Sequence, residues 1–132
     1  MKLSEYDKYL KENIPYKFGG EDMDGFDCIG LVVHVAKENG ITIPNVNHSN
    51  KTIKSYNDMM KKELDAECWV EVDRSPNVCV TFITAGVVNH IGWMIDNSRF
   101  IHIQKDKNVM ISKISDSMWK KRLFKFYMYK GK

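Results

Sequence analysis

The sequence predicts an α+β fold in which N-terminal helices pack on an antiparallel sheet of about five or six strands. Two observations lead to this prediction. In the first half of the chain, apolar residues recur at helical spacing, whereas the second half holds short alternating segments separated by turn residues. A run of helices followed by a run of strands is typical of α+β domains.

The length and composition are those of one folded domain, which we expect to cover residues 1–132. Hydrophobic residues make up 43% of the 132 residues and charged residues 28%, which is ordinary for a soluble globular protein. The net charge of +3 comes without a basic stripe interleaved with aromatic residues, so we do not expect nucleic acid as a partner. No apolar run approaches the roughly 20 residues that span a bilayer, so we expect no membrane partner either.

Two helices are expected before residue 40. Residues 3–13 form a short amphipathic pattern that Pro15 ends, and its apolar face consists of Leu3, Tyr6, Leu10 and Ile14. Residues 28–39 form a helix with apolar groups on nearly every side, which must therefore be buried, and we expect it to pack against the sheet. Asp27 is its expected N-cap, and Gly40 is expected to end it in the left-handed conformation.

The remaining elements follow from spacing and turn signals. Residues 51–64 form another amphipathic pattern and are expected to be helical. Alternating segments bounded by turn residues predict strands over 68–72, 78–83, 87–95, 99–104 and 109–111. The last alternating segment, 125–129, is expected to add an edge strand to this sheet.

Cys28 is the candidate nucleophile because it follows a loop rich in glycine and acidic residues and opens a buried helix. A thiol in the first turn of a helix meets the positive end of the helix dipole, which favours the reactive thiolate. The unpaired N–H groups there can also stabilise an oxyanion. A buried structural cysteine remains the alternative. Cys68 and Cys79 lie in predicted strands and are expected to be core residues.

A base for this thiol must come from the four histidines, of which His90 and His102 form the candidate pair. They lie on the two arms of a predicted hairpin whose loop is residues 96–98. A three-residue loop places Gly92 opposite His102, so that His90 becomes its diagonal neighbour on the same face, about 7 Å away. A two-residue loop would separate the histidines. His34, on the helix of Cys28, and His48, in a polar loop, are weaker candidates.

A Cys–His–His set is chemically sufficient for cleavage of an amide bond. The first histidine takes the thiol proton and later protonates the leaving amine, while the second fixes its tautomer and orientation. The alternative is that both histidines are polar positions on a solvated face. A zinc site formed by Cys28, His90 and His102 is conceivable but not expected. The three cysteines show no CxxC spacing, so neither a structural metal nor a disulfide framework is expected, and no cofactor is implied.

Several segments resemble the NlpC-type cell-wall peptidases, in that family's order and over nearly the whole chain. The sequences at 14–20 and 25–32, which surround Cys28, resemble the family's nucleophile region. The segments at 90–95 and 99–102, which contain His90 and His102, resemble its second signature, and Trp119 to Leu123 resembles its C-terminal end. The possibility of a phage-tail-associated member follows from the compact single domain.

This resemblance implies a reduced papain-like α+β fold and no metal. It implies that Cys28 is the nucleophile, His90 the base and His102 the orienting third residue. Tyr16 matches a tyrosine whose hydroxyl lies beside the nucleophile, and Asp27 matches an aspartate that helps to shape the substrate pocket. The family cleaves amide bonds in peptidoglycan stem peptides, commonly next to D-glutamate, so the resemblance implies a murein peptide as substrate.

One departure from the family leaves alternatives open. Ile29 stands where the family usually has serine, which removes a hydroxyl near the substrate cleft and puts the usual stem-peptide recognition in question. An amidase, deamidase or acyltransferase on the same fold is one alternative, and a catalytically inactive wall- or tail-binding module is another.

The route to the cell wall is a separate expectation. Acidic residues among positions 1–7 exclude the apolar core of a signal peptide there, so we expect synthesis in the cytoplasm without a classical export signal. Lysis, a phage tail or a secretion machine would then deliver the enzyme, with tail or secretion-machine proteins as partners.

Overall fold

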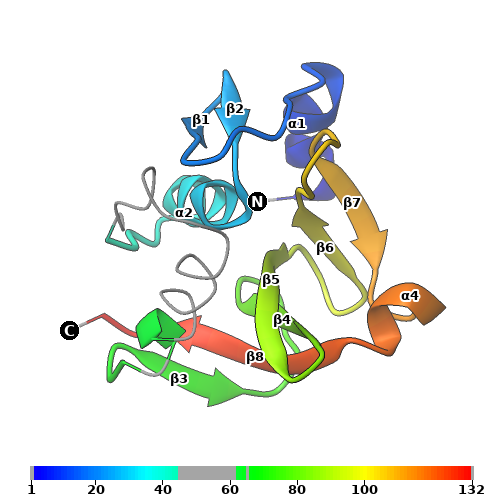
Figure 1. Ribbon diagram of the computed structural model, residues 1–132. Helices are drawn as coiled ribbons and strands as arrows, with labels where there is room; N and C mark the ends of the chain where they lie inside the picture. Colours follow the sequence, from blue (N-terminus) through cyan, green and yellow to red (C-terminus); the bar gives the residue numbers. More distant parts are fainter. Residues whose placement is uncertain (1, 45–61, 65, 132) are drawn as a thin grey trace.

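A six-stranded antiparallel sheet with the strand order β3-β8-β4-β5-β6-β7 forms the centre of the fold (Figure 1). The computed structural model describes residues 2–44, 62–64 and 66–131. The strands of this sheet are β3 (Trp69–Val72), β4 (Cys79–Thr84), β5 (Val87–Met94), β6 (Arg99–His102), β7 (Met110–Lys113) and β8 (Leu123–Tyr129). The other elements are η1 (Leu3–Tyr6), α1 (Asp7–Lys11), the hairpin β1 (Glu21–Asp22) and β2 (Gly25–Phe26), α2 (Cys28–Glu38) and α4 (Ser117–Lys120). The predicted α+β architecture is confirmed.

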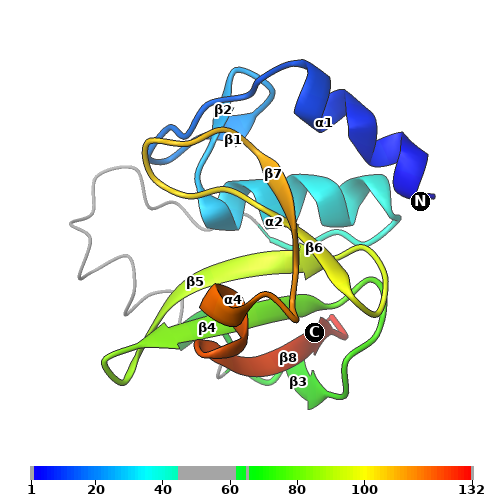
Figure 2. The same ribbon diagram turned by 90° about the vertical axis from the view of Figure 1, so that its right-hand side faces the viewer.

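The sheet contributes residues to two hydrophobic cores, and Figure 2 shows α2 running along one face of the sheet. The larger core lies between the N-terminal helices and the sheet, where Leu31 and Val35 of α2 join Trp93 and Ile101 of the sheet. The smaller core joins residues of the sheet to Trp119 of α4. Among the described residues, none of the helices has both the length and the apolar character needed to cross a membrane.

The helix α2 begins at the predicted residue and ends at Glu38, one residue before the predicted end. The carboxylate of Asp27 accepts a hydrogen bond from the Gly30 N–H at 2.8 Å, which is the interaction of an N-cap. At the other end Gly40 has a φ of +83°, and the Ile41 N–H donates to the carbonyl of Ala36. This pattern is a Schellman motif. Two local signals in the sequence therefore fix where the helix carrying Cys28 starts and stops.

The apolar face predicted for the N-terminal helix was correct for Tyr6 and Ile14 and wrong for Leu3 and Leu10. Leu3 and Leu10 are 38% and 37% exposed, whereas Tyr6, Tyr9 and Ile14 are buried. The segment begins as the 3-10 helix η1 and only then continues as α1. Tyr6 and Tyr9 turn inward on either side of the junction between η1 and α1, whereas Leu3 and Leu10 turn outward.

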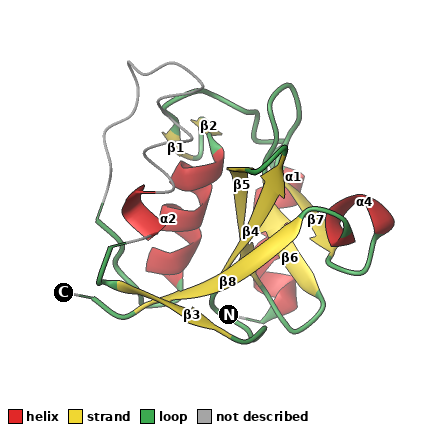
Figure 3. Cartoon of the chain, turned by 60° about the horizontal axis from the view of Figure 1, so that its bottom comes forward, coloured by secondary structure: helices red, strands yellow, loops and turns green. Residues whose placement is uncertain are grey.

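The position predicted for the last strand was also wrong, because β8 is not at an edge. It pairs with β3 on one side and with β4 on the other (Figure 3). Its side chains meet both cores: Tyr127 belongs to the larger and Phe126 packs against the smaller. Alternation alone cannot distinguish an edge strand from an inner one when both faces are covered. Of the helix predicted over 51–64, only the helical residues 62–64 are described, and His48 lies outside the described residues.

Candidate active site

The hairpin of β5 and β6 has the register that the three-residue loop predicted. The Ile95 N–H donates to the Arg99 carbonyl at 2.9 Å, and Trp93 pairs with Ile101. Asp96 holds the loop closed, because its carboxylate accepts hydrogen bonds from the backbone N–H groups of residues 98 and 99. Continued by one residue, this register places Gly92 opposite His102, as expected.

His90 and His102 are hydrogen-bonded to each other, with His90 Nε2 2.9 Å from His102 Nδ1. Gly92 makes this approach possible. A Cβ atom there would lie 2.9 Å from the ring of Phe100 and 3.3 Å from the Cβ of His102, closer than ordinary van der Waals contact. The two histidines therefore share a face of the sheet, as the loop length predicted.

A β-bulge lies next to His90. Phe82 of β4 pairs with His90, but the next residue, Ile83, pairs with Val88, which leaves Asn89 as the extra residue of β5. Bulges increase the local twist and change the direction of neighbouring side chains. From His90 to Trp93 the pairing of β5 with β4 is regular again.

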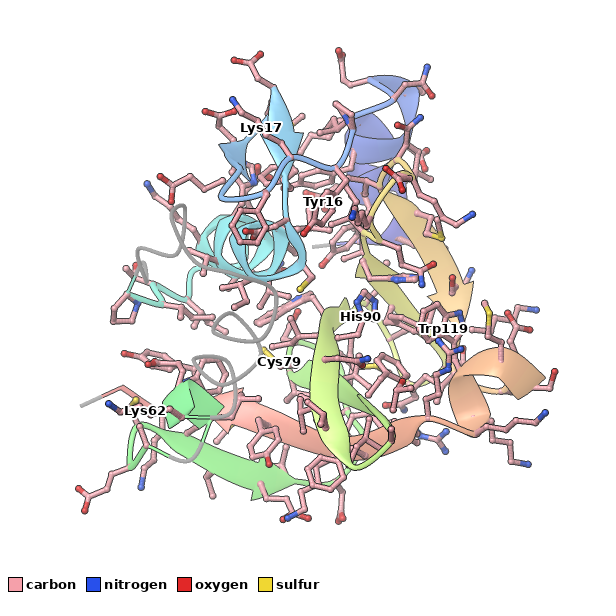
Figure 4. The ribbon with its side chains drawn as sticks, in the orientation of Figure 1. Tyr16, Lys17, Lys62, Cys79, His90 and Trp119 are labelled. Atoms are coloured by element: carbon pink, nitrogen blue, oxygen red, sulfur yellow. The ribbon has the colours of Figure 1, made fainter. Side chains whose placement is uncertain are left out.

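The imidazole pair is enclosed by aromatic rings. His90 is stacked on Trp119 and also contacts Phe82, while His102 meets the rings of Phe100 and Trp119. Figure 4 shows His90 beside Trp119. Burial lowers the pKa of His90 to about 4, with a smaller contribution from the positive charge of Arg122. Burial lowers the pKa of the fully buried His102 to about 2. Both imidazoles are therefore neutral at pH 7, as a general base requires.

A serine that the sequence analysis did not single out completes the polar chain. Ser112 Oγ of β7 lies 2.8 Å from His102 Nε2, so that both ring nitrogens of His102 have hydrogen-bonding partners. The segment that joins β6 to β7 is seven residues long (103–109). A connection of that length does not determine a strand register, so no sequence signal identified Ser112.

Cys28 is the first residue of α2 and is buried, with 6% exposure. The fully buried Asp27 supports this position with both carboxylate oxygens. One accepts from the Gly30 N–H within the first turn, and the other accepts from the Gly19 N–H at 2.9 Å. Asp27 thus connects the start of the helix to the preceding loop. Its expected role in shaping the substrate pocket stays a prediction.

Tyr16 lies close enough to Cys28 and Asp27 for their charges to act on its hydroxyl. Burial and, to a smaller extent, the negative charges of Cys28 and Asp27 raise the pKa of Tyr16 to about 12. The backbone of Tyr16 is held by its N–H, which donates to the Lys107 carbonyl at 3.0 Å, and by a bridge to Phe26. The phenol therefore remains protonated at neutral pH and can donate a hydrogen bond.

These contacts form two groups: Cys28 with Tyr16 and Asp27, and His90 with His102. The elements that carry them, α2 and β5, pack directly against each other.

The other candidate residues lie elsewhere. His34 is hydrogen-bonded to the Tyr9 hydroxyl, at 3.1 Å. Cys79 is fully buried, and its burial raises the pKa of its thiol, as suits a core residue; Cys68 is partly buried against the larger core. Within residues 2–44, 62–64 and 66–131, no three acidic, cysteine or histidine side chains are placed to hold a metal ion.

The fold and this arrangement of groups define a class: small α+β domains with a cysteine at the start of a helix and a pair of histidines on the sheet against which that helix packs. The chain belongs to the NlpC/P60 family, whose profile matches residues 13–128.

Three known proteins illustrate the similarity. The chain is 26% identical over 115 residues to "Murein DD-endopeptidase MepS/Murein LD-carboxypeptidase" of Escherichia coli K12, covering 84% of this chain and 53% of that protein. It is 29% identical over 113 residues to the "Probable endopeptidase NlpC" of the same organism, covering 83% and 66%. A lipoprotein-like NLP/P60 family structure from Staphylococcus aureus Mu50 has a TM-score of 0.65 at 21% identity, covering 96% and 40%. The chain thus spans about half the length of MepS.

Proposed function

We propose that this protein is a cysteine peptidase that hydrolyses amide bonds in peptidoglycan stem peptides. The observation that carries the proposal is the bonded imidazole pair of His90 and His102, on a sheet strand that packs directly against the helix beginning at Cys28. The names of the relatives MepS and NlpC, a murein endopeptidase and a probable endopeptidase, support this reaction and this substrate class.

In the proposed mechanism, His90 is the base. Its Nε2 is engaged with His102, so its Nδ1 is the nitrogen that accepts the proton of the Cys28 thiol. The thiolate attacks the amide carbon, and the oxyanion is stabilised by N–H groups in the first turn of α2. The imidazolium of His90 then protonates the leaving amine through Nδ1. Water, activated by the same nitrogen, hydrolyses the thioester and regenerates the thiol.

The remaining predicted residues have supporting roles in this proposal. His102 orients His90 through their hydrogen bond and favours one tautomer of it. Tyr16, protonated and close to Cys28, is a donor for the substrate carbonyl or the oxyanion. Asp27 holds the backbone around the nucleophile in place. Its two carboxylate oxygens accept hydrogen bonds from the N–H groups of Gly19 in the preceding loop and Gly30 in the helix.

Substrate preference depends on the position after the nucleophile. Ile29 is 9% exposed and belongs to the larger core. The side chain is directed into the protein and has no hydroxyl to offer a substrate. We therefore propose that murein peptides remain the substrate class, with a preference among stem peptides that differs from that of relatives with serine at this position.

The test is incubation of the purified protein with peptidoglycan digests and synthetic stem peptides, followed by mass spectrometry of the products. Cys28→Ala should abolish cleavage. Cys68→Ala, which removes a partly exposed thiol elsewhere, is the matched control and should retain it. The masses of the fragments identify the bond that is cut.

Other outcomes decide between the alternatives. A product mass that shows an added amine or alcohol instead of water would make the protein an acyltransferase. Release of ammonia without chain cleavage would make it a deamidase. No product at all, together with alkylation of Cys28 no faster than that of Cys68, would contradict the enzymatic function and favour a binding module.

A further inference from the structure

The polar chain on the sheet extends one strand beyond the histidine pair. In the register of β6 and β7, Phe100 pairs with Ser112 and His102 pairs with Met110. Ser112 is therefore the diagonal neighbour of His102 on the face that also carries His90. Three neighbouring strands, β5, β6 and β7, thus contribute one polar side chain each. The bonds are 2.9 Å between the imidazoles and 2.8 Å from His102 Nε2 to Ser112 Oγ.

Counting protons along this chain gives its direction. If His90 Nδ1 is to accept the thiol proton, the neutral His90 must carry its own proton on Nε2, and that N–H must donate to His102 Nδ1. His102 Nδ1 is then an acceptor, so the proton of the neutral His102 lies on Nε2. Within the described part of the chain, the hydrogen-bonding partner of that N–H is Ser112 Oγ, 2.8 Å away.

The opposite direction would disable the base. If the Ser112 hydroxyl donated to His102 Nε2, His102 would carry its proton on Nδ1 and donate it to His90 Nε2. His90 would then carry its proton on Nδ1 and have no lone pair for the thiol. The two directions differ by the position of one proton on each ring, and a serine hydroxyl can end either of them because it both donates and accepts. Only the direction in which Ser112 accepts leaves His90 Nδ1 free for the thiol proton.

We propose that Ser112 is a positioning residue that accepts the Nε2–H of His102 and thereby holds His90 in the tautomer whose Nδ1 is free to act as the base. This inference rests on the proposed function for its catalytic consequence. The tautomer itself is a property of the folded protein without substrate and is measurable separately.

The experiment compares Ser112→Thr with Ser112→Val. The two side chains have nearly the same shape, both suit a β-strand, and only threonine keeps the hydroxyl. Ser112→Ala is a second variant without a hydroxyl, should valine disturb the packing. Histidine tautomers are determined by long-range ¹H–¹⁵N correlation spectra of the ¹⁵N-labelled proteins at pH 7, which distinguish protonated from unprotonated ring nitrogens.

We expect the wild type and Ser112→Thr to show His102 protonated on Nε2 and His90 protonated on Nε2. In Ser112→Val and Ser112→Ala, we expect a mixture of tautomers at both rings. Loss of one such hydrogen bond corresponds to a decrease of about five- to ten-fold in kcat for peptide cleavage, with KM unchanged. A merely structural role for Ser112 would alter stability but neither the tautomers nor kcat.

The possible failures are distinguishable. Identical tautomers in all four proteins, or His102 protonated on Nδ1 in the wild type, would overturn the role of Ser112 whatever the activity. If the wild type and Cys28→Ala both fail to cleave murein peptides, the proposed function fails, while the tautomers of Ser112→Val still decide whether the hydroxyl directs the two protons.

Discussion

The indole ring of Trp119 stacks on the imidazole ring of His90, with ring centroids 5.3 Å apart and planes inclined by 24°. The same indole meets His102 edge-on, at 4.7 Å and 84°. One side chain of α4 therefore contacts both imidazoles. Trp119 belongs to the smaller core, so this core positions the histidine pair.

Replacement of Trp119 is expected to affect stability and activity together. Trp119→Ala removes a side chain that is only 2% exposed and should lower the free energy of unfolding by about 3–5 kcal/mol. Trp119→Phe keeps an aromatic ring against His90, so its stability and its activity should both decrease less than those of Trp119→Ala. Urea denaturation and peptide cleavage measure the two effects. An unchanged kcat in folded Trp119→Ala would show that the ring only packs.

The stability of the protein should fall as the pH decreases from about 6.5 to about 4. The pKa values of His90 and His102 are about 4 and about 2 in the folded protein, against 6.5 when they are unperturbed. In this window the unfolded chain binds protons that the folded protein does not. Each histidine can therefore contribute a slope of up to about 1.4 kcal/mol per pH unit. Urea denaturation between pH 7 and 4 measures the slope.

The control for this pH dependence is His102→Gln, whose amide does not titrate. Its free energy of unfolding should fall less steeply than that of the wild type over the same range. Other groups that titrate there, such as His34 and Glu38, are present in both proteins and cancel in the comparison. Equal slopes for the two proteins would contradict a neutral buried His102.

Asp27 should stabilise the start of α2 through two separable bonds. Asp27→Ala removes both acceptors and is expected to lower the free energy of unfolding by about 2 kcal/mol, about half from the N-cap and half from the bond to Gly19. Asp27→Ser keeps a capping oxygen for Gly30 but is too short to bond Gly19 as well. The free energy of unfolding of Asp27→Ser should lie between those of the wild type and Asp27→Ala. Equal stability of Asp27→Ala and Asp27→Ser would show that the cap contributes nothing.

Gly30→Ala should destabilise the protein although alanine is the better helix former. Intrinsic propensity favours alanine by about 1 kcal/mol, but a Cβ at Gly30 would lie 2.0 Å from the backbone carbonyl oxygen of Gly20. We expect a net loss of about 1–3 kcal/mol because the loop before Cys28 has to move. Lys37→Ala, at an exposed position of the same helix, should change stability by less than about 0.5 kcal/mol. A gain in thermal stability for Gly30→Ala would contradict the close approach.

The parts of the site that were predictable are those determined over a few residues. Asp27 and Gly40 carry local cap signals, so both ends of α2 followed from the sequence. The loop at 96–98 is short enough to determine a register, and this register placed His90 beside His102. The exposure of Leu3 and Leu10 did not follow, because the spacing of apolar residues does not show which of two adjoining helix faces the rest of the protein covers.

The parts that were not predictable depend on contacts between distant segments. Ser112 reaches His102 only through the pairing of β6 with β7 across a seven-residue connection. Trp119 reaches His90 from a helix of one turn, too short to leave a periodic pattern. The bulge at Asn89 changes the register by one residue, and alternating hydrophobicity gives no signal of it.

The inner position of β8 determines when the sheet can be completed. Ribosomes extend a chain from its N-terminus, so β4 emerges with β5 available on one side and nothing to pair on the other. Until residues 123–129 have been synthesised, β3 has no neighbour and one edge of β4 presents its N–H and C=O groups to any extended segment nearby. The nascent protein therefore passes through a stage in which the unpaired edge of β4 can pair with strands of other chains. Synthesis of β8, which pairs with that edge, ends this stage.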